Sequence, residues 1–157
     1  LTPFGKRVLR FLEKNGIRAD LSHAGREAFW SVLDNTPLPI VTHSCADAVT
    51  PHRRNLTDEQ IRALIRRGSV IGLNFYSEFC GGTMESFVKH ALHILDMGGE
   101  KCLALGSDFD GCSALPAGLE GPEGFPRLAQ ALLSAGVGEN TLRDIFSDNA
   151  RRVLLGE

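Results

Sequence analysis

Two histidines, His23 and His43, each follow an apolar segment of the sequence and could together bind a metal ion. Neutral imidazole is a zinc ligand, with Zn–N bonds of about 2.0 to 2.1 Å. Each histidine has a neighbouring serine, Ser22 or Ser44, that could orient its ring. Because a single histidine at the end of a strand is more often a hydrogen-bonded structural residue, the pair alone leaves metal binding and a structural role both open.

Two carboxylates, Asp108 and Asp110, lie in a glycine-flanked segment at 106–111. A carboxylate at such a turn can move a proton between a metal-bound water and a leaving amine. The same pair could instead form a local turn or cap a helix. Since alternate residues of an extended chain point to opposite faces, only one of the two needs to face a site.

A short basic run contains Arg53 and Arg54 and comes soon after His43 in the sequence. A guanidinium group there could hold a substrate carboxylate through two parallel hydrogen bonds. A run of this kind in a loop can also be an ordinary solvated surface. Asn74 is a further polar residue at the end of an apolar segment, and we predict that it contacts the substrate.

A second histidine pair, His90 and His93, is three residues apart in a predicted helix, so both side chains share one helix face. This spacing resembles a metal-binding pair. A position in the middle of a helix lies in the outer layer of an α/β fold, however. We therefore favour packing, or a hydrogen bond to a loop carbonyl, as the role of these two residues.

The elements that position these residues alternate along the chain. Apolar spacing and capping signals predict helices near 3–15, 26–33, 58–67, 84–97, 125–135 and 141–155. Apolar segments between them predict four strands at 17–23, 39–43, 69–75 and 102–106. Alternation of this kind predicts an α/β fold with a parallel sheet covered on both faces.

The ends of the predicted strands carry the polar residues, namely His23, His43, Asn74 and Asp108. The carboxyl ends of parallel strands lie on one side of a sheet, which is where (β/α)8 barrels build their active sites. We therefore expect the four side chains to converge. A full barrel needs eight strands and about 250 residues, so the four predicted strands correspond to half a barrel or to a smaller open sheet.

Composition narrows the class of protein. The 157 residues are 43% hydrophobic and 23% charged, with a net charge of -2, which predicts one soluble domain and excludes nucleic acid as a partner. No apolar run reaches the roughly 20 residues of a membrane span, and no nucleotide-binding glycine motif occurs. We predict a cytoplasmic location, and a homo-oligomer is possible. Four widely spaced cysteines are expected to be free, mostly buried thiols, with a disulfide as the alternative.

Seven segments in order along the chain resemble the membrane dipeptidase (renal dipeptidase) family of zinc metallopeptidases. They are LTPFG (1–5), DLSH (20–23), PIVTHS (39–44), RRNLTD (53–58), NFY (74–76), HALHI (90–94) and GSDFDG (106–111). The segments cover essentially the whole chain. Each is modest alone, but a chance match of all seven in this order is improbable.

The resemblance implies a (β/α)8 barrel that hydrolyses dipeptides with two zinc ions, of which residues 1–157 form the carboxy-terminal half. It implies that His23 and His43 bind the second zinc, that Arg54 binds the substrate carboxylate, and that Asp108 transfers the proton. The family's ligands for the first zinc and its bridging glutamate are expected before Leu1, as is any targeting signal. We therefore predict that the isolated chain is inactive.

Two alternatives remain beside the dipeptidase. The first is a non-catalytic half-barrel that pairs with a partner chain through its exposed strand edges. The second is another metal-dependent amidohydrolase, such as a lactonase or a deaminase. Replacement of Arg54 discriminates between the enzymes, because only a dipeptidase needs it to bind a free carboxylate.

Overall fold

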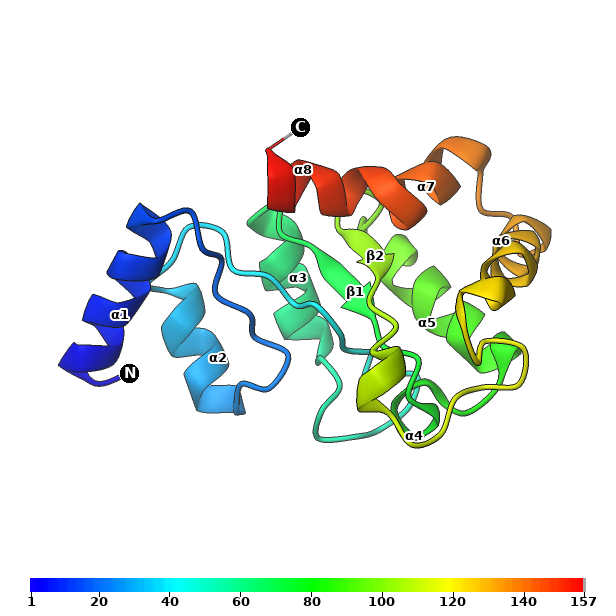
Figure 1. The fold of residues 1–157 in the computed structure, drawn as a ribbon, viewed down its shortest axis with the longest axis horizontal. Helices are drawn as coiled ribbons and strands as arrows, with labels where there is room; N and C mark the ends of the chain where they lie inside the picture. Colours follow the sequence, from blue (N-terminus) through cyan, green and yellow to red (C-terminus); the bar gives the residue numbers. More distant parts are fainter. Residues whose placement is uncertain (157) are drawn as a thin grey trace.

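The computed structural model describes residues 1–156, which form helices around a small parallel sheet (Figure 1). The elements in chain order are α1 (Pro3–Lys14), α2 (Arg26–Leu33), α3 (Asp58–Arg66), β1 (Ile71–Leu73), α4 (Ser77–Cys80), α5 (Met84–Asp96), β2 (Leu103–Leu105), η1 (Phe109–Gly111), η2 (Pro122–Gly124), α6 (Phe125–Ser134), α7 (Glu139–Arg143), η3 (Asp144–Asp148) and α8 (Asn149–Leu155). The α/β class predicted from the sequence is confirmed.

The sheet has two strands rather than the four that we predicted. β1 and β2 pair in parallel, with Ile71 opposite Leu103. The two earlier segments join through single parallel bridges, one from Asp20 to Ile40 and one from Val41 to Ile71. All four segments therefore lie side by side in chain order, but the prediction of strands at 17–23 and 39–43 is wrong in its extent.

Backbone hydrogen bonds join these two segments around Ile40, and side chains then bond the amides that follow. The amides of Ser22 and Thr42 donate to Asp20 Oδ1 at 3.0 and 3.1 Å. The amide of His43 donates to Ser22 Oγ at 3.0 Å. Because these amides are used in this way, they do not donate to the carbonyls of a neighbouring strand, and regular pairing ends after one bridge.

The main core lies between the sheet and α3, α5 and α6. Its fully buried side chains include Phe75, Phe87, Ile61, Leu64, Ile71, Leu73, Ile94, Leu103, Leu128 and Leu132. α3 begins with the predicted capping box, in which Thr57 and Gln60 bond to each other's backbone amides. The core therefore holds the carboxyl ends of β1 and β2 on a rigid base.

The last helical segment runs across the starting ends of the strands (Figure 1). The helix predicted at 141–155 is divided into α7, one π-helical turn (η3) and α8. The π-helical turn contains one extra residue, which rotates the side chains of α8 around the helix axis relative to those of α7. Asn149, which is buried, donates from Nδ2 to the carbonyls of Glu100 and Leu103 at 2.8 Å each. These bonds fix α8 to the start of β2.

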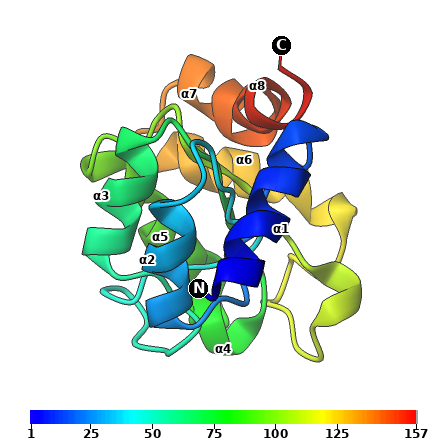
Figure 2. The same cartoon turned by 90° about the vertical axis from the view of Figure 1, so that its left-hand side faces the viewer.

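The amino-terminal helices α1 and α2 lie together at one end of the molecule (Figures 1 and 2). Thr2 caps α1 by accepting a hydrogen bond from the amide of Gly5 at 3.1 Å. The helix buries only Leu9, whereas Phe4 and Phe11 are 66% and 64% exposed. Within residues 1–156, no helix is both long and apolar enough to cross a membrane.

Candidate active site

His23 and His43 meet at the ends of their two segments. The Nε2 atoms of the two rings lie 3.0 Å apart, and the rings are arranged edge to face. The structure thus brings together two side chains that are twenty positions apart in the sequence, as the convergence of strand ends predicts.

The two nitrogens fit one metal ion as a pair of ligands. Tetrahedral zinc with bonds of about 2.0 to 2.1 Å separates two nitrogens by roughly 3.3 Å, so 3.0 Å requires only a small shift. Asp108 Oδ2 lies 4.0 Å from His43 Nε2. Among residues 1–156, no group of three or more His, Cys, Asp or Glu side chains could hold a metal. A metal ion between His23 and His43 would therefore need ligands beyond these two.

Thiols are poor competitors for such a metal. All four cysteines are free, and Cys45, Cys80 and Cys102 are buried. Burial raises the pKa of Cys102 to about 12. Burial, with Asp108 as the next cause, raises the pKa of Cys112 to about 11. Because a metal binds the thiolate and not the thiol, the histidines are the better ligands near neutral pH.

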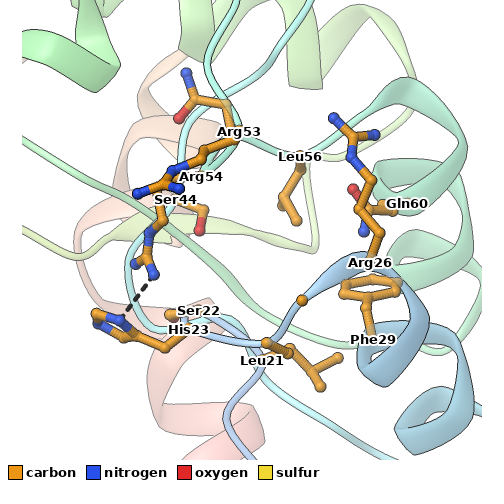
Figure 3. Close-up of a pocket in the computed structure, with 13 residues that line it drawn as sticks. Leu21, Ser22, His23, Arg26, Phe29, Ser44, Arg53, Arg54, Leu56 and Gln60 are labelled. Carbon is orange, nitrogen blue, oxygen red and sulfur yellow. Dashed lines mark hydrogen bonds between the residues drawn. The ribbon is translucent and has the colours of Figure 1, made fainter.

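Arg54 lies beside the histidine pair. Its Nη1 is 2.7 Å from His23 Nδ1, as the dashed line in Figure 3 shows. Its guanidinium carbon also lies 5.8 Å from the centre of the Phe79 ring, a cation–π distance. The guanidinium is thus held at the rim with part of its hydrogen-bonding capacity available.

The loop that carries Arg54 is fixed from below by two buried side chains. Asn55 donates from Nδ2 to the carbonyls of Thr50 and Phe79 at 2.8 Å each. His90 Nδ1 accepts from the amide of Ala46 at 3.1 Å, and its Nε2 lies 3.1 Å from Thr50 Oγ1. The sequence analysis did not identify this role of Asn55. Its position between Arg54 and the apolar Leu56 was the available sign that a polar side chain there supports the loop.

The second histidine pair does not form a metal site. His90 is fully buried and bonds to the loop after His43, while His93 Nε2 lies 2.7 Å from Asp58 Oδ1. The expected structural role is what the contacts show, with one correction. We predicted either packing or a hydrogen bond to a loop carbonyl, and the partner of His90 is instead a loop amide, for which the ring offers an acceptor nitrogen.

Asp108 occupies a constrained position at the end of β2. It has a φ of 58°, the one positive value for a residue other than glycine in the described chain. A side chain at Gly111 would overlap the Asp108 carboxylate and displace it, so glycine at 111 leaves room for that carboxylate. Asp110 is exposed. Of the two carboxylates, Asp108 is therefore the one that faces the histidines.

Asn74 lies beneath Asp108. Its Nδ2 donates to Asp108 Oδ2 at 3.2 Å, and its Oδ1 accepts from the amide of Tyr76 at 2.5 Å. The side chain is fully buried. Substrate contact by Asn74 stays a prediction, and the contacts present are those of a residue that orients Asp108.

Two cavities open on the rim. One, of about 270 Å³, lies between the His23 segment and α3 and is lined by Arg26, Arg53, Arg54 and Gln60 among others (Figure 3). The other, of about 360 Å³, is bordered by His23, Arg54, Phe79 and Asp108. The second is in the size range of small-molecule sites, and three of the predicted site residues, His23, Arg54 and Asp108, border it.

Comparison with known proteins places the chain in a family. The model of the membrane dipeptidase family (peptidase family M19) matches residues 1–156. The chain belongs to this family. An uncharacterized Klebsiella pneumoniae protein from the pqqA 5′ region is 36% identical over 163 residues, which cover 98% of this chain and 60% of that protein.

Solved structures give the same result. The dipeptidase AC, a metallopeptidase of family M19, is 33% identical with a TM-score of 0.92, over 98% of this chain and 48% of that one. A Rhodobacter sphaeroides metallopeptidase liganded with a phosphinate mimic of the dipeptide L-Ala-D-Ala is also 33% identical with a TM-score of 0.92, over 99% and 46%. The chain therefore spans about half the length of these relatives.

Proposed function

We propose that the chain forms the carboxy-terminal half of a (β/α)8 barrel and supplies one side of a zinc-dependent dipeptidase site. The observation that supports this most strongly is the convergence of His23, His43, Arg54 and Asp108 on one rim. The four residues come from separate segments, and each has a chemical property that dipeptide hydrolysis needs.

His23 and His43 would hold one zinc ion of a two-zinc centre, with the other ligands contributed from outside the chain. A zinc ion bound there would supply a Lewis acid for the scissile carbonyl. Asp108 lies 4.0 Å from His43 Nε2 and is oriented by Asn74, so its carboxylate can take a proton from the attacking water and pass it to the leaving amine.

Arg54 binds the free carboxylate of the dipeptide. Its guanidinium is at the rim and can exchange the contact with His23 Nδ1 for a carboxylate, which it binds through two parallel hydrogen bonds. Asn55 and His90 hold the loop beneath it. This arrangement favours dipeptides over neutral amides and esters.

A fusion tests the proposal. The amino-terminal half of the Rhodobacter sphaeroides metallopeptidase, joined ahead of this chain, should hydrolyse L-Ala-D-Ala when zinc is added, whereas this chain alone should not. Circular dichroism establishes that the fusion is folded. A folded, zinc-loaded fusion without dipeptidase activity would contradict the proposal.

Arg54→Ala in that fusion separates a dipeptidase from another amidohydrolase. The variant should lose at least tenfold in kcat/KM for the dipeptide, because the carboxylate has lost its partner. It should change little for the dipeptide amide, which has no carboxylate. Little change for either substrate would favour an amidohydrolase that acts on neutral groups.

A second candidate role is assembly with a complementary half-barrel. The outer face of α1 exposes Phe4, Val8 and Phe11, and the solved relatives are about twice as long as this chain. We propose that the missing half of the barrel covers this face. Gel filtration of the chain with a separately expressed complementary half should show a one-to-one complex, and Phe4→Asp with Phe11→Asp should prevent it.

A further inference from the structure

The hydrogen-bond partners of His43 determine which of its ring nitrogens carries the hydrogen. We propose that Asp20 and Thr42 are positioning residues that hold His43 as the Nδ1–H tautomer, so that the lone pair of Nε2 faces the metal position. The inference rests on the proposed function for the identity of the ligand, while the tautomer itself follows from contacts within the chain.

The chain of contacts begins at the Asp20 carboxylate, which can only accept hydrogen bonds when ionised. It receives donors from the backbone amide and hydroxyl of Ser22 and from the amide and hydroxyl of Thr42. Partial burial raises the pKa of Asp20, but the hydrogen bond from the Thr42 hydroxyl and the three other donors lower it further, to below its usual range. The carboxylate is therefore charged at neutral pH.

The Thr42 hydroxyl lies between the Asp20 carboxylate and the ring of His43. Thr42 Oγ1 is 2.5 Å from Asp20 Oδ2, 2.8 Å from His43 Nδ1 and 3.1 Å from Ser22 Oγ. A hydroxyl has one hydrogen to donate, and the nearest acceptor is also the charged one. Thr42 Oγ1 therefore presents a lone pair to His43, and Nδ1 must carry the hydrogen that completes the contact.

Ser22 ties the backbone of His43 to the same carboxylate. Its Oγ donates to Asp20 Oδ1 at 2.8 Å and accepts from the His43 amide at 3.0 Å. Gly72 and Gly106 have no side chains and leave space for the Thr42 carbonyl, which lies where their Cβ atoms would be. Both the ring and the main chain of His43 are thus positioned from Asp20.

The contacts of His23 lead independently to the same tautomer for His43. In the metal-free chain Arg54 can only donate, so His23 Nδ1 must accept, and the ring hydrogen of His23 is then on Nε2. That nitrogen lies 3.0 Å from His43 Nε2, which must be the acceptor. Two separate sets of partners therefore leave the lone pair of His43 Nε2 directed into the site. For His23 Nε2 to bind a metal, Arg54 has to release Nδ1 so that the hydrogen can move there.

Nitrogen NMR of the histidine side chains in the metal-free chain at pH 8 tests the proposal. In the wild type, His43 should be the Nδ1–H tautomer. Arg54→Ala is placed in every further sample, because it removes the second set of contacts that fixes the His43 tautomer through His23. In this background Thr42→Val, which keeps the side-chain shape but removes the hydroxyl, should give a mixture of tautomers, whereas Thr42→Ser should keep the Nδ1–H form. An unchanged His43 tautomer in the Thr42→Val sample, with the backbone amide spectrum of a folded chain, would overturn the proposal.

Zinc titration of the same variants provides the second readout. Thr42→Val should bind zinc about tenfold more weakly than the wild type, as expected when an outer partner of a ligating histidine is lost, and Thr42→Ser should bind within about twofold. If the tautomer depends on Thr42 but no variant binds zinc, the proposed function fails and the positioning role stands. If zinc binds His43 but the His43 tautomer does not change when Thr42 is replaced, the positioning role is wrong and the proposed function stands.

Discussion

Two histidine pairs occupy different regions of this molecule, and their surroundings differ. His23 and His43 lie at the rim, where their Nε2 atoms face each other. His90 and His93 lie on α5 in the outer layer, where each ring bonds to a fixed group of the protein. The pair that is close in sequence has separate structural partners, whereas the pair that is twenty positions apart converges.

The difference shows what makes a histidine available to a ligand. His90 uses both ring nitrogens within the protein, on the Ala46 amide and the Thr50 hydroxyl, and is fully buried. His43 has one nitrogen held by Thr42, which leaves the other directed toward His23. An oriented ring nitrogen that no other structural group uses therefore distinguishes the rim pair, which we propose binds zinc, from the helix pair.

The largest expected effect is on stability at the helix pair. His90→Ala should lower the free energy of unfolding by about 3 to 4 kcal/mol, because it leaves a cavity and an unsatisfied Ala46 amide. Urea denaturation measures the loss. His90→Asn, which can keep an acceptor near that amide, should lose less. The zinc affinity of the Ala variant should stay within about twofold of that of the wild type. A larger change would contradict the assignment of zinc binding to His23 and His43 and of a structural role to His90.

The second prediction concerns pH. Burial, with nearby His93 as the next cause, lowers the pKa of His90 to about 4 from 6.5. Above pH 6.5 the ring is neutral in both states, so its contribution to stability is complete there. As the pH falls from 6.5 to 4, only the unfolded chain gains the proton, and stability drops by up to about 3 kcal/mol.

His90→Asn removes that titration. Unfolding free energies of the wild type and the variant, measured between pH 7 and 4, should therefore converge as the pH falls. Parallel curves would show that His90 titrates normally and is not held neutral by its surroundings.

The rim pair should show the opposite behaviour. His43→Ala should weaken zinc binding by at least tenfold, about 1.4 kcal/mol, because one of two ligands is lost. Its unfolding free energy should change by less than about 1 kcal/mol, since the side chain is partly exposed. Calorimetric zinc titration and urea denaturation on the same sample give both values.

The smallest effect is expected at Asp110. This side chain is exposed, whereas its neighbour Asp108 contacts His43 and Asn74. Asp110→Asn should change zinc affinity by less than about twofold and stability by less than about 0.5 kcal/mol. If Asp110→Asn weakened zinc binding as much as His43→Ala does, Asp110 rather than Asp108 would be the carboxylate that faces the site.

Much of this arrangement could be predicted from the sequence because strand ends and helix caps depend on local patterns. The capping box at Thr57 and the convergence of His23 with His43 are examples. The short extent of the first two strands could not be predicted, because it depends on the side chain of Asp20 reaching amides in two segments. The burial of Asn74 beneath Asp108 likewise depends on three-dimensional packing.

The most direct test of the account is the identity of the atoms that bind zinc in this chain. X-ray absorption on the chain loaded with one equivalent of zinc should show two imidazole nitrogens at about 2.0 to 2.1 Å, and His43→Ala should reduce this contribution to that of one imidazole. Sulfur at about 2.3 Å, or a spectrum that the substitution leaves unchanged, would contradict the assignment of His23 and His43 as the metal ligands.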